Sequence, residues 1–287
     1  MKNILVPTDF SEQAENAAEV AAAIARKVGA HIQLLHVIDL PSYVDSPSFR
    51  LIAESSEIKQ KADVQIEELA KKAFFDGVTV SFSVEYDSPY QCVVDTAKRD
   101  DYELIVIGSH GTSGIEKFLI GSVTEKVIQF APCPVLAVKN RMESFDVKSL
   151  VFASNFFGEI SENFQQVQKF ADLYGAKIHL LKVNTRHHFA STRYNRNIIE
   201  GFVDECHVRN YTVNIYDDGT EEEGILHFCE ETNPDLLVIP THGRTGLSHL
   251  INGSLAENLS EHSPRPVLCI KVKHVPIKYG IIGPYSK

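Results

Sequence analysis

The stretch that decides the fold is LIVIGSHG, residues 104–111, an unbroken apolar run that stops at a turn containing two glycines. It returns further along the chain as LLVIPTHG, residues 236–243. Two later segments repeat in the same way: Ile120-Gly121-Ser122 as Asn252-Gly253-Ser254, and Pro134-Val135-Leu136 as Pro266-Val267-Leu268. All three pairs lie 132 residues apart, from 104 to 236, from 121 to 253 and from 134 to 266. A constant spacing over three motifs indicates an internal repeat.

The front parts of the two copies repeat at a longer spacing. Residues 5–9 (LVPTD) match residues 151–155 (VFASN), and residues 34–37 match residues 180–183, in both cases 146 positions on. The second copy is therefore 14 residues shorter between its second and fourth strands, which is the difference between the spacings of 146 and 132. The boundary falls in a polar stretch near residues 140–147. We expect one domain at 1–142, a second at 146–273 and a tail at 274–287.

Each copy alternates strand and helix patterns, beginning and ending with a strand. Residues 4–6 form a continuous apolar run, as in a strand covered on both faces, whereas residues 78–84 alternate like a strand nearer the sheet edge. Ser11 precedes an alanine-rich helix that stops at Gly29, and another helix is expected from about Glu54 to Phe75. This alternation predicts the α/β class, with parallel strands joined by right-handed helical crossovers.

Composition limits the functions that the chain can have. A length of 287 residues suggests two domains at about 100–200 residues each. The net charge of −10 argues against binding to nucleic acid. No segment reaches the roughly 20 apolar residues that cross a bilayer, and the first residues do not form a signal peptide. The five cysteines are scattered without a C-x-x-C pair. We therefore expect a cytoplasmic protein with reduced thiols.

The candidate binding motif is Gly108-x2-Gly111-x9-Gly121-Ser122, which runs from the end of a strand to the start of a helix. In open α/β sheets, ligands bind beyond the carboxyl ends of the strands. A phosphate there meets backbone N–H groups and the positive end of the helix. Glycine lets an anion approach the backbone closely. The alternative is a glycine-rich turn with an ordinary helix cap, but the strand-end position and the repeated spacing favour the phosphate site.

The same residues carry a resemblance to a known family. With Pro7-Thr8-Asp9 after the first strand and Leu35-His36-Val37 in the second, the motif resembles the universal stress protein family. The resemblance is to tandem members, and it extends to about Lys273. It implies two Rossmann-like domains of the adenine nucleotide alpha hydrolase-like type, each with a five-stranded parallel sheet flanked by helices.

The resemblance also implies a ligand, which is ATP, or ADP or AMP in its place. Asp9 would contact the ribose and the Val37 backbone the adenine, while the glycine loop would surround ribose and phosphates, with Mg²⁺ as an optional ion between phosphate oxygens. The implied first site comprises Pro7, Thr8, Asp9, Val37, Gly108, His110, Gly111, Gly121, Ser122, Val123 and Thr124.

The second copy departs from the family pattern at two positions. Asn155 replaces the aspartate and can still bond a ribose, but Pro240 replaces the first glycine and removes a backbone donor. A weaker second site would comprise Asn155, Val183, Gly243, Gly253 and Ser254, with Arg244 as a further phosphate contact. The alternative is a degenerate copy that is kept for packing. Nearby, Thr220-x-x-Glu223 predicts a capping box, and the acidic run Glu221-Glu222-Glu223 is typical of a first-turn partner of the helix dipole.

Three hypotheses of function stay open. The chain contains no P-loop, no G-x-G-x-x-G fingerprint and no G-x-S-x-G elbow, and we find no general base for a phosphate-attacking water. The leading hypothesis is therefore a cytoplasmic ATP-binding stress or regulatory module without efficient turnover. The first rival is a Mg-dependent adenine-nucleotide hydrolase that uses Asp9. The second is a ligand-free structural pseudodimer that binds a partner. The resemblance implies that the two repeats pack through Val135–Val138 and Val267–Ile270, and it leaves a homodimer of chains open.

Overall fold

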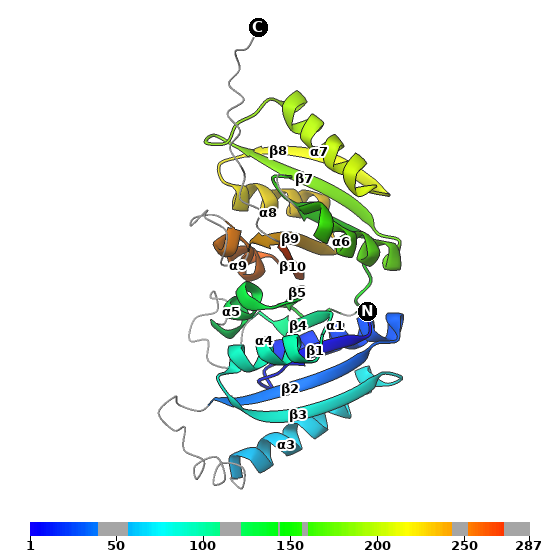
Figure 1. The fold of residues 1–287 in the computed structure, drawn as a ribbon, viewed down its shortest axis with the longest axis vertical. Helices are drawn as coiled ribbons and strands as arrows, with labels where there is room; N and C mark the ends of the chain where they lie inside the picture. The colour runs from blue at the N-terminus through cyan, green and yellow to red at the C-terminus, as the bar shows by residue number, and fades with distance from the viewer. Residues whose placement is uncertain (40–56, 110–121, 143, 157–159, 243–251, 273–287) are drawn as a thin grey trace.

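The computed structural model describes residues 1–39, 57–109, 122–142, 144–156, 160–242 and 252–272 (Figure 1). The N-terminal half holds β1 (Asn3–Pro7), α1 (Glu12–Val28), β2 (His31–Asp39), α3 (Glu57–Ala70), the 3-10 turn η1 (Ala73–Phe75), β3 (Thr79–Asp87), α4 (Pro89–Arg99), β4 (Leu104–Gly108), α5 (Ser122–Phe130) and β5 (Val135–Val138). The C-terminal half holds β6 (Ser149–Ala153), α6 (Ile160–Tyr174), β7 (Lys177–Thr185), α7 (Thr192–Cys206), β8 (Tyr211–Asp218), α8 (Glu221–Thr232), β9 (Leu236–His242), α9 (Asn252–His262) and β10 (Val267–Val272).

All the strands of the described residues join one sheet, in the order β3-β2-β1-β4-β5-β10-β9-β6-β7-β8. Figure 1 shows this sheet running along the long axis of the molecule, from β3 at one end to β8 at the other. Neighbouring strands within each half are parallel, and the sheet carries helices on both faces. The prediction of an α/β fold with a parallel sheet flanked by helices is confirmed. The expected edge position of the third strand is also correct.

The two halves meet where β5 pairs with β10, and this pairing is antiparallel. Leu136 lies opposite Leu268, and Val135 and Ala137 lie opposite Cys269 and Val267. Position 268 is the repeat equivalent of position 136, at the spacing of 132. The pairing is thus symmetric about the Leu136–Leu268 pair, as expected where two copies of one surface meet.

Side chains alternate between two cores, as the strand period of two requires. Leu104 and Val106 of β4 face the core under α1, α3, α6 and α7, whereas Ile105 and Ile107 face the core under α4, α5, α8 and α9. Each core contains residues of both halves, so apolar burial is continuous across the β5–β10 junction. The hydrophobic stabilisation of each half therefore depends on the other.

The segment between β5 and β6 differs from the expected polar stretch. Phe145 and Val147 are buried, and the ring of Phe145 meets that of Tyr174 edge-on, with centroids 5.9 Å apart. The amide side chain of Asn140 donates to the carbonyl of Pro264. Phe145 and Val147 thus anchor a connection whose other described residues are mostly exposed.

Several helix ends follow local chemistry. The hydroxyl of Ser11 accepts from Ala14 N at 3.2 Å, and Gly29 ends α1 in the left-handed region at φ 70°. The Thr220 hydroxyl accepts from Glu223 N at 3.1 Å, which confirms the helix start predicted there. The expected helix to Phe75 is wrong at its C-terminal end, because α3 stops at Ala70 and a separate 3-10 turn follows.

Candidate functional site

The candidate site of the N-terminal half lies where β1 and β4 part. These strands pair only through Ile4 and Leu5 with Leu104 and Ile105, and then diverge toward their carboxyl ends. The strand β1 lies between β2 on one side and β4 on the other. The strand order reverses here, so this is the topological switch point of the N-terminal half. Pro7, the last residue of β1, still pairs with Leu35 of β2.

The turn after β1 fixes the position of Asp9. The Thr8 amide donates to Leu35 O at 2.9 Å. The Thr8 hydroxyl oxygen accepts from Phe10 N at 3.1 Å. Phe10 adopts φ 64°, a left-handed conformation that costs a non-glycine residue about 1–2 kcal/mol. Oδ1 of Asp9 accepts from the hydroxyl of Ser11 at 2.6 Å and from its amide at 3.1 Å. The carboxylate is therefore held at the N-terminus of α1, beside the switch point.

The end of β2 supplies a backbone edge. Leu35 O faces β1, since it accepts from Thr8 N. Backbone polar groups alternate sides along a strand, so the N–H and C=O of Val37 face the same way as those of Leu35. The pairing of β1 with β2 ends at Pro7 and Leu35, and Val37 lies beyond that end. Its donor and acceptor thus point into the space above β1.

His36, between these two residues, has a structural role. Its ring Nδ1 lies 2.8 Å from Thr8 O, and its ring centroid lies 4.4 Å from that of Phe10. These contacts hold the end of β2 against the turn after β1.

The end of β4 is tied to the start of α5. The Thr124 hydroxyl, in the first turn of α5, donates to Gly108 O at 2.8 Å. Ser109 N donates to Val138 O at 2.9 Å, which holds the end of β4 to the end of β5. Gly108 also packs closely against α1, because a Cβ added there would lie 2.8 Å from the carbonyl carbon of Gln13 and 2.9 Å from Ala14 N. No side chain fits this approach, which explains the glycine without reference to a ligand.

The remaining predicted residues are only partly described. Ser122 and Val123 open α5, with Ser122 exposed and Val123 packed against the core under that helix. His110, Gly111 and Gly121, as well as Gly243 and Arg244 of the second copy, lie outside the described residues. Gly253 and Ser254 belong to the first turn of α9. The structure thus brings Pro7, Thr8, Asp9, Val37, Gly108, Ser122, Val123 and Thr124 to one edge of the sheet.

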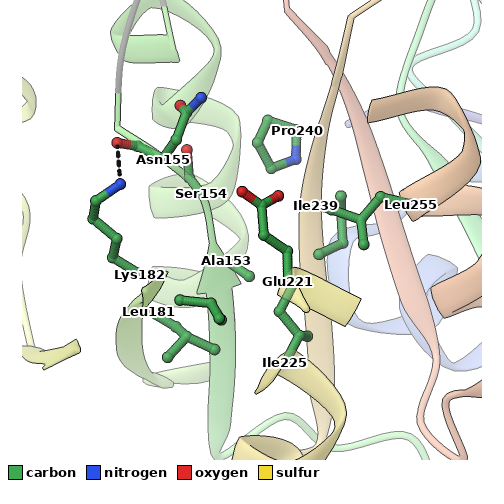
Figure 2. Close-up of a pocket in the computed structure, with 11 residues that line it drawn as sticks. Ala153, Ser154, Asn155, Leu181, Lys182, Glu221, Ile225, Ile239, Pro240 and Leu255 are labelled. Atoms are coloured by element: carbon green, nitrogen blue, oxygen red, sulfur yellow. Dashed lines mark hydrogen bonds between the residues drawn. The ribbon is translucent and has the colours of Figure 1, made fainter. Parts of the chain in front are cut away.

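The corresponding place in the C-terminal half contains a pocket that is open to solvent (Figure 2). It lies where β6 and β9 part, since these strands pair only through residues 150–152 and 236–238. Ser154, Asn155 and Pro240 line it at the strand ends. Its walls are mostly apolar and include Ala153, Leu181, Val183, Ile225, Ile239 and Leu255. The predicted residues Asn155 and Val183 therefore share one cavity.

Two charged residues also line this pocket, and sequence reasoning assigned neither of them to it. Lys182 is buried, its Nζ donates to Asn155 O at 3.3 Å, and burial lowers its pKa, while the nearby Glu221 acts in the opposite direction. Figure 2 shows the Glu221 carboxylate directed toward Ser154 and Pro240, on the other side of β6 from the Lys182 ammonium. The repeat alignment pairs Glu221 with Pro89, 132 positions earlier, and so indicates only that a carboxylate replaces a proline at the start of the equivalent helix.

Comparison with known proteins identifies the family. A profile described as the Universal stress protein family matches residues 1–139 and 212–271. The chain belongs to this family. The resemblance inferred from the glycine motif and Asp9 is thereby confirmed.

Individual relatives cover this universal stress protein to different extents. Universal stress protein MJ0531 of Methanocaldococcus jannaschii is 35% identical over 141 residues, which are 48% of this chain and 82% of the relative. Universal stress protein Slr1230 of Synechocystis is 23% identical over 293 aligned residues, covering 94% of this chain and 100% of the relative. A crystal structure of a universal stress protein from Archaeoglobus fulgidus matches with a TM-score of 0.74 at 23% identity, over 94% of this chain and 98% of the other. The last two likenesses extend over both halves.

The described part of this universal stress protein offers no group of three or more His, Cys, Asp or Glu side chains arranged to hold a metal ion. Among the described helices, none is both long and apolar enough to cross a bilayer.

Proposed function

We propose that the N-terminal half binds an adenine nucleotide, with ATP as its first ligand, and that the protein acts as a cytoplasmic stress-response or regulatory binding module. The observation that carries the proposal is the backbone edge of Val37 beside the carboxylate of Asp9. An adenine ring offers a donor and an acceptor on one edge, which complement the C=O and N–H at a strand end. A ribose offers two hydroxyl donors, which complement a carboxylate.

The position of α5 supports the phosphate part of the site. Ser122 and Val123 open this helix, and the Thr124 hydroxyl holds its first turn to the end of β4. Unpaired N–H groups and the helix dipole favour an anion at such a terminus. Phosphates placed there would lie on the same edge of the sheet as Asp9. Mg²⁺ would enter with the phosphates, and ADP or AMP would use the same base and ribose contacts.

The proposal is one of binding, with Asp9 as a positioning residue. The hydroxyl and amide of Ser11 already orient its carboxylate, so the group is fixed before a ligand arrives. Such preorganisation reduces the entropy cost of binding. Slow hydrolysis would be detected as product formed during the titration described below.

The symmetric pairing of β5 with β10 supports a second part of the proposal, an internal pseudo-dimer of two universal stress domains at 1–142 and 146–273. The two halves contact each other through equivalent residues, and Lys271 of β10 donates to Ala131 O. Light scattering measures whether two such chains associate further: the chain mass indicates the pseudo-dimer alone, and twice that mass indicates a homodimer of chains.

Calorimetric titration of ATP tests the nucleotide site. We expect one strong site per chain, and a loss of about tenfold to a hundredfold in affinity for Asp9→Ala, since hydrogen bonds to charged groups contribute about 1.5–3 kcal/mol. Gly121→Val, in the glycine loop, should abolish binding. Asn155→Ala is the matched control, because it removes the equivalent side chain of the other half and should leave this site intact.

Two results would contradict the proposal. Unchanged affinity in both Asp9→Ala and Gly121→Val, with folding verified by thermal unfolding, would remove the assigned site. Two equal ATP sites per chain would refute the preference for the N-terminal half.

A further inference from the structure

The pocket of the C-terminal half differs in charge from the nucleotide site proposed for the N-terminal half. Where α4 begins with Pro89, α8 begins with Glu221, and the carboxylate of Glu221 faces the cavity (Figure 2). Within the described residues no hydrogen bond or ion pair is made to this carboxylate. Glu221 is only partly buried and lies at the pocket mouth.

The position of this carboxylate follows from the packing of α8. Gly224 contacts β7 so closely that an added Cβ would lie 2.6 Å from Cγ1 of Val183. The equivalent residue of α4 is Cys92, a larger side chain at the same place. Glycine therefore allows α8 to lie directly on Val183, and Glu221, one turn earlier, is brought over the ends of β6 and β9.

The strand end of this pocket offers less to a phosphate than that of the N-terminal half. Pro240 has no N–H to donate where the N-terminal half has Gly108. The Nζ of Lys182, which also lines the pocket, donates to Asn155 O on the other side of β6 from the Glu221 carboxylate. Like charges at short range in a partly buried site repel strongly, since the effective dielectric constant is well below that of water.

The same pocket is suited to a flat ring. Apolar side chains form most of its wall. Ser154 N donates to Leu181 O at 3.0 Å, so the backbone N–H and C=O of Val183 open above the end of β6 in the same way as those of Val37 above β1. One carboxylate acceptor at the mouth then selects a ligand with donor groups.

We propose that the C-terminal pocket binds an aromatic heterocycle that bears an amino group and no phosphate, and that the Glu221 carboxylate accepts a hydrogen bond from this amino group. The chain would then carry one site for a phosphorylated ligand and one for an unphosphorylated ligand. The proposal goes beyond the nucleotide site of the N-terminal half and does not require it.

Adenosine, inosine and ATP are the probes, because adenosine carries an amino group where inosine carries a carbonyl oxygen. Isoleucine methyl groups observed by NMR report on each site separately in a protein of 32.0 kDa. Ile239 and Ile225 line the pocket, and Ile107 is the equivalent of Ile239 in the N-terminal half. Substitution of each of the three by valine assigns its signal.

We expect adenosine to shift Ile239 and Ile225, with an affinity at least tenfold above that of inosine. ATP should shift Ile107 and leave Ile239 unchanged at the same concentration. Glu221→Gln should reduce the preference for adenosine over inosine to less than threefold, since the amide both donates and accepts, and it should allow ATP to shift Ile239. Glu230→Gln is the matched control: it removes the same charge from an exposed position of the same helix and should change none of these results.

The outcomes separate the two proposals. Equal affinity for adenosine and inosine, ATP binding at Ile239 in the unaltered chain, or no shift of Ile239 with any probe would each overturn this inference. A missing shift of Ile107 with ATP would count against the nucleotide site of the N-terminal half and leave this inference standing.

Discussion

The two halves place equivalent helices, α1 and α6, over the same face of the sheet. They fill the space between helix and sheet with different side chains. In the N-terminal half α1 presents alanines, among them Ala14, Ala17, Ala18, Ala21, Ala22 and Ala25, all nearly inaccessible to solvent. In the C-terminal half the rings of Phe152, Phe156, Phe164 and Phe202 contact one another with centroids 4.9–6.0 Å apart. Phe164 stands where Ala18 does in the first half, 146 positions on, and Phe152 where Val6 does.

This comparison shows that topology is set by the alternation of strands and helices, whereas packing is free to vary. Small side chains let a helix approach the sheet closely, and large rings fill a wider gap at similar density. The first turn of α1 packs against Gly108, which has no side chain. The equivalent residue of the second half is Pro240, whose ring would not allow a helix to pack so closely on the strand.

The largest effect is expected from the aromatic cluster. Phe202→Ala removes the ring that contacts the other three, and large-to-small changes of buried aromatic residues cost about 3–5 kcal/mol. Urea unfolding followed by circular dichroism measures the loss. Phe189→Ala is the control, because that ring is 73% exposed and its removal should change the free energy of unfolding by less than about 0.5 kcal/mol. Similar values for the two variants would show that the rings do not stabilise the C-terminal half.

A smaller change in the free energy of unfolding is expected at Gly108, where the first half needs a residue without a side chain. Gly108→Ala places a Cβ against the backbone of Gln13 and Ala14, and such overpacking costs about 1–3 kcal/mol. Gly201→Ala, within α7, meets nothing within 4 Å and should stabilise the protein by about 0.5–1 kcal/mol. The same unfolding experiment compares the two. A stabilising Gly108→Ala would mean that α1 does not approach β4 as closely as described.

The smallest effect concerns an exposed pair that only the second half has. His227 Nδ1 lies 2.7 Å from Oδ2 of Asp218, and this hydrogen bond raises the pKa of His227 above its ordinary 6.5 and lowers that of Asp218 below 3.8. The equivalent residues of the first half are Tyr86 and Asp95, which cannot form such a pair. NMR titration of the His227 ring should show the raised pKa, and Asp218→Asn should return it to the ordinary range.

The stability that this pair adds has a defined pH window. It is fully present only while His227 is protonated and Asp218 ionised, so it declines as the pH rises through the raised pKa of His227. It declines again as the pH falls through the lowered pKa of Asp218. A pKa of His227 that is the same in the parent and in Asp218→Asn would rule out the contact in solution.

The sequence predicted the strands well, because apolar runs such as residues 104–107 are dictated by burial on both faces. It predicted the end of α3 poorly: the helical pattern continues toward Phe75, but the chain turns after Ala70 to bring that ring into the core. The aromatic cluster was not predictable either, since Phe152, Phe164 and Phe202 are distant in sequence and meet only through the tertiary fold.

The candidate site was predictable in part. Asp9 and Gly108 follow strands and so had to meet at one edge of the sheet. The role of Glu221 could not be obtained from its own helix, where an acidic first turn is ordinary, and required the direction of its side chain. Lys182 was equally hidden: it contacts the turn after β6 much as His36 contacts the turn after β1, through a different chemical group.

The antiparallel pairing of β5 with β10 has a consequence for how the halves can differ. Two separate chains that met through this strand would form homodimers as readily as mixed pairs, in proportions that change with dilution. Residues 139–148 join β5 to β6 and so hold the two halves on one chain, and the halves meet at an effective concentration in the millimolar range or above, whatever the amount of protein. Every molecule then carries one of each half, so a substitution in one binding pocket is never copied into the other.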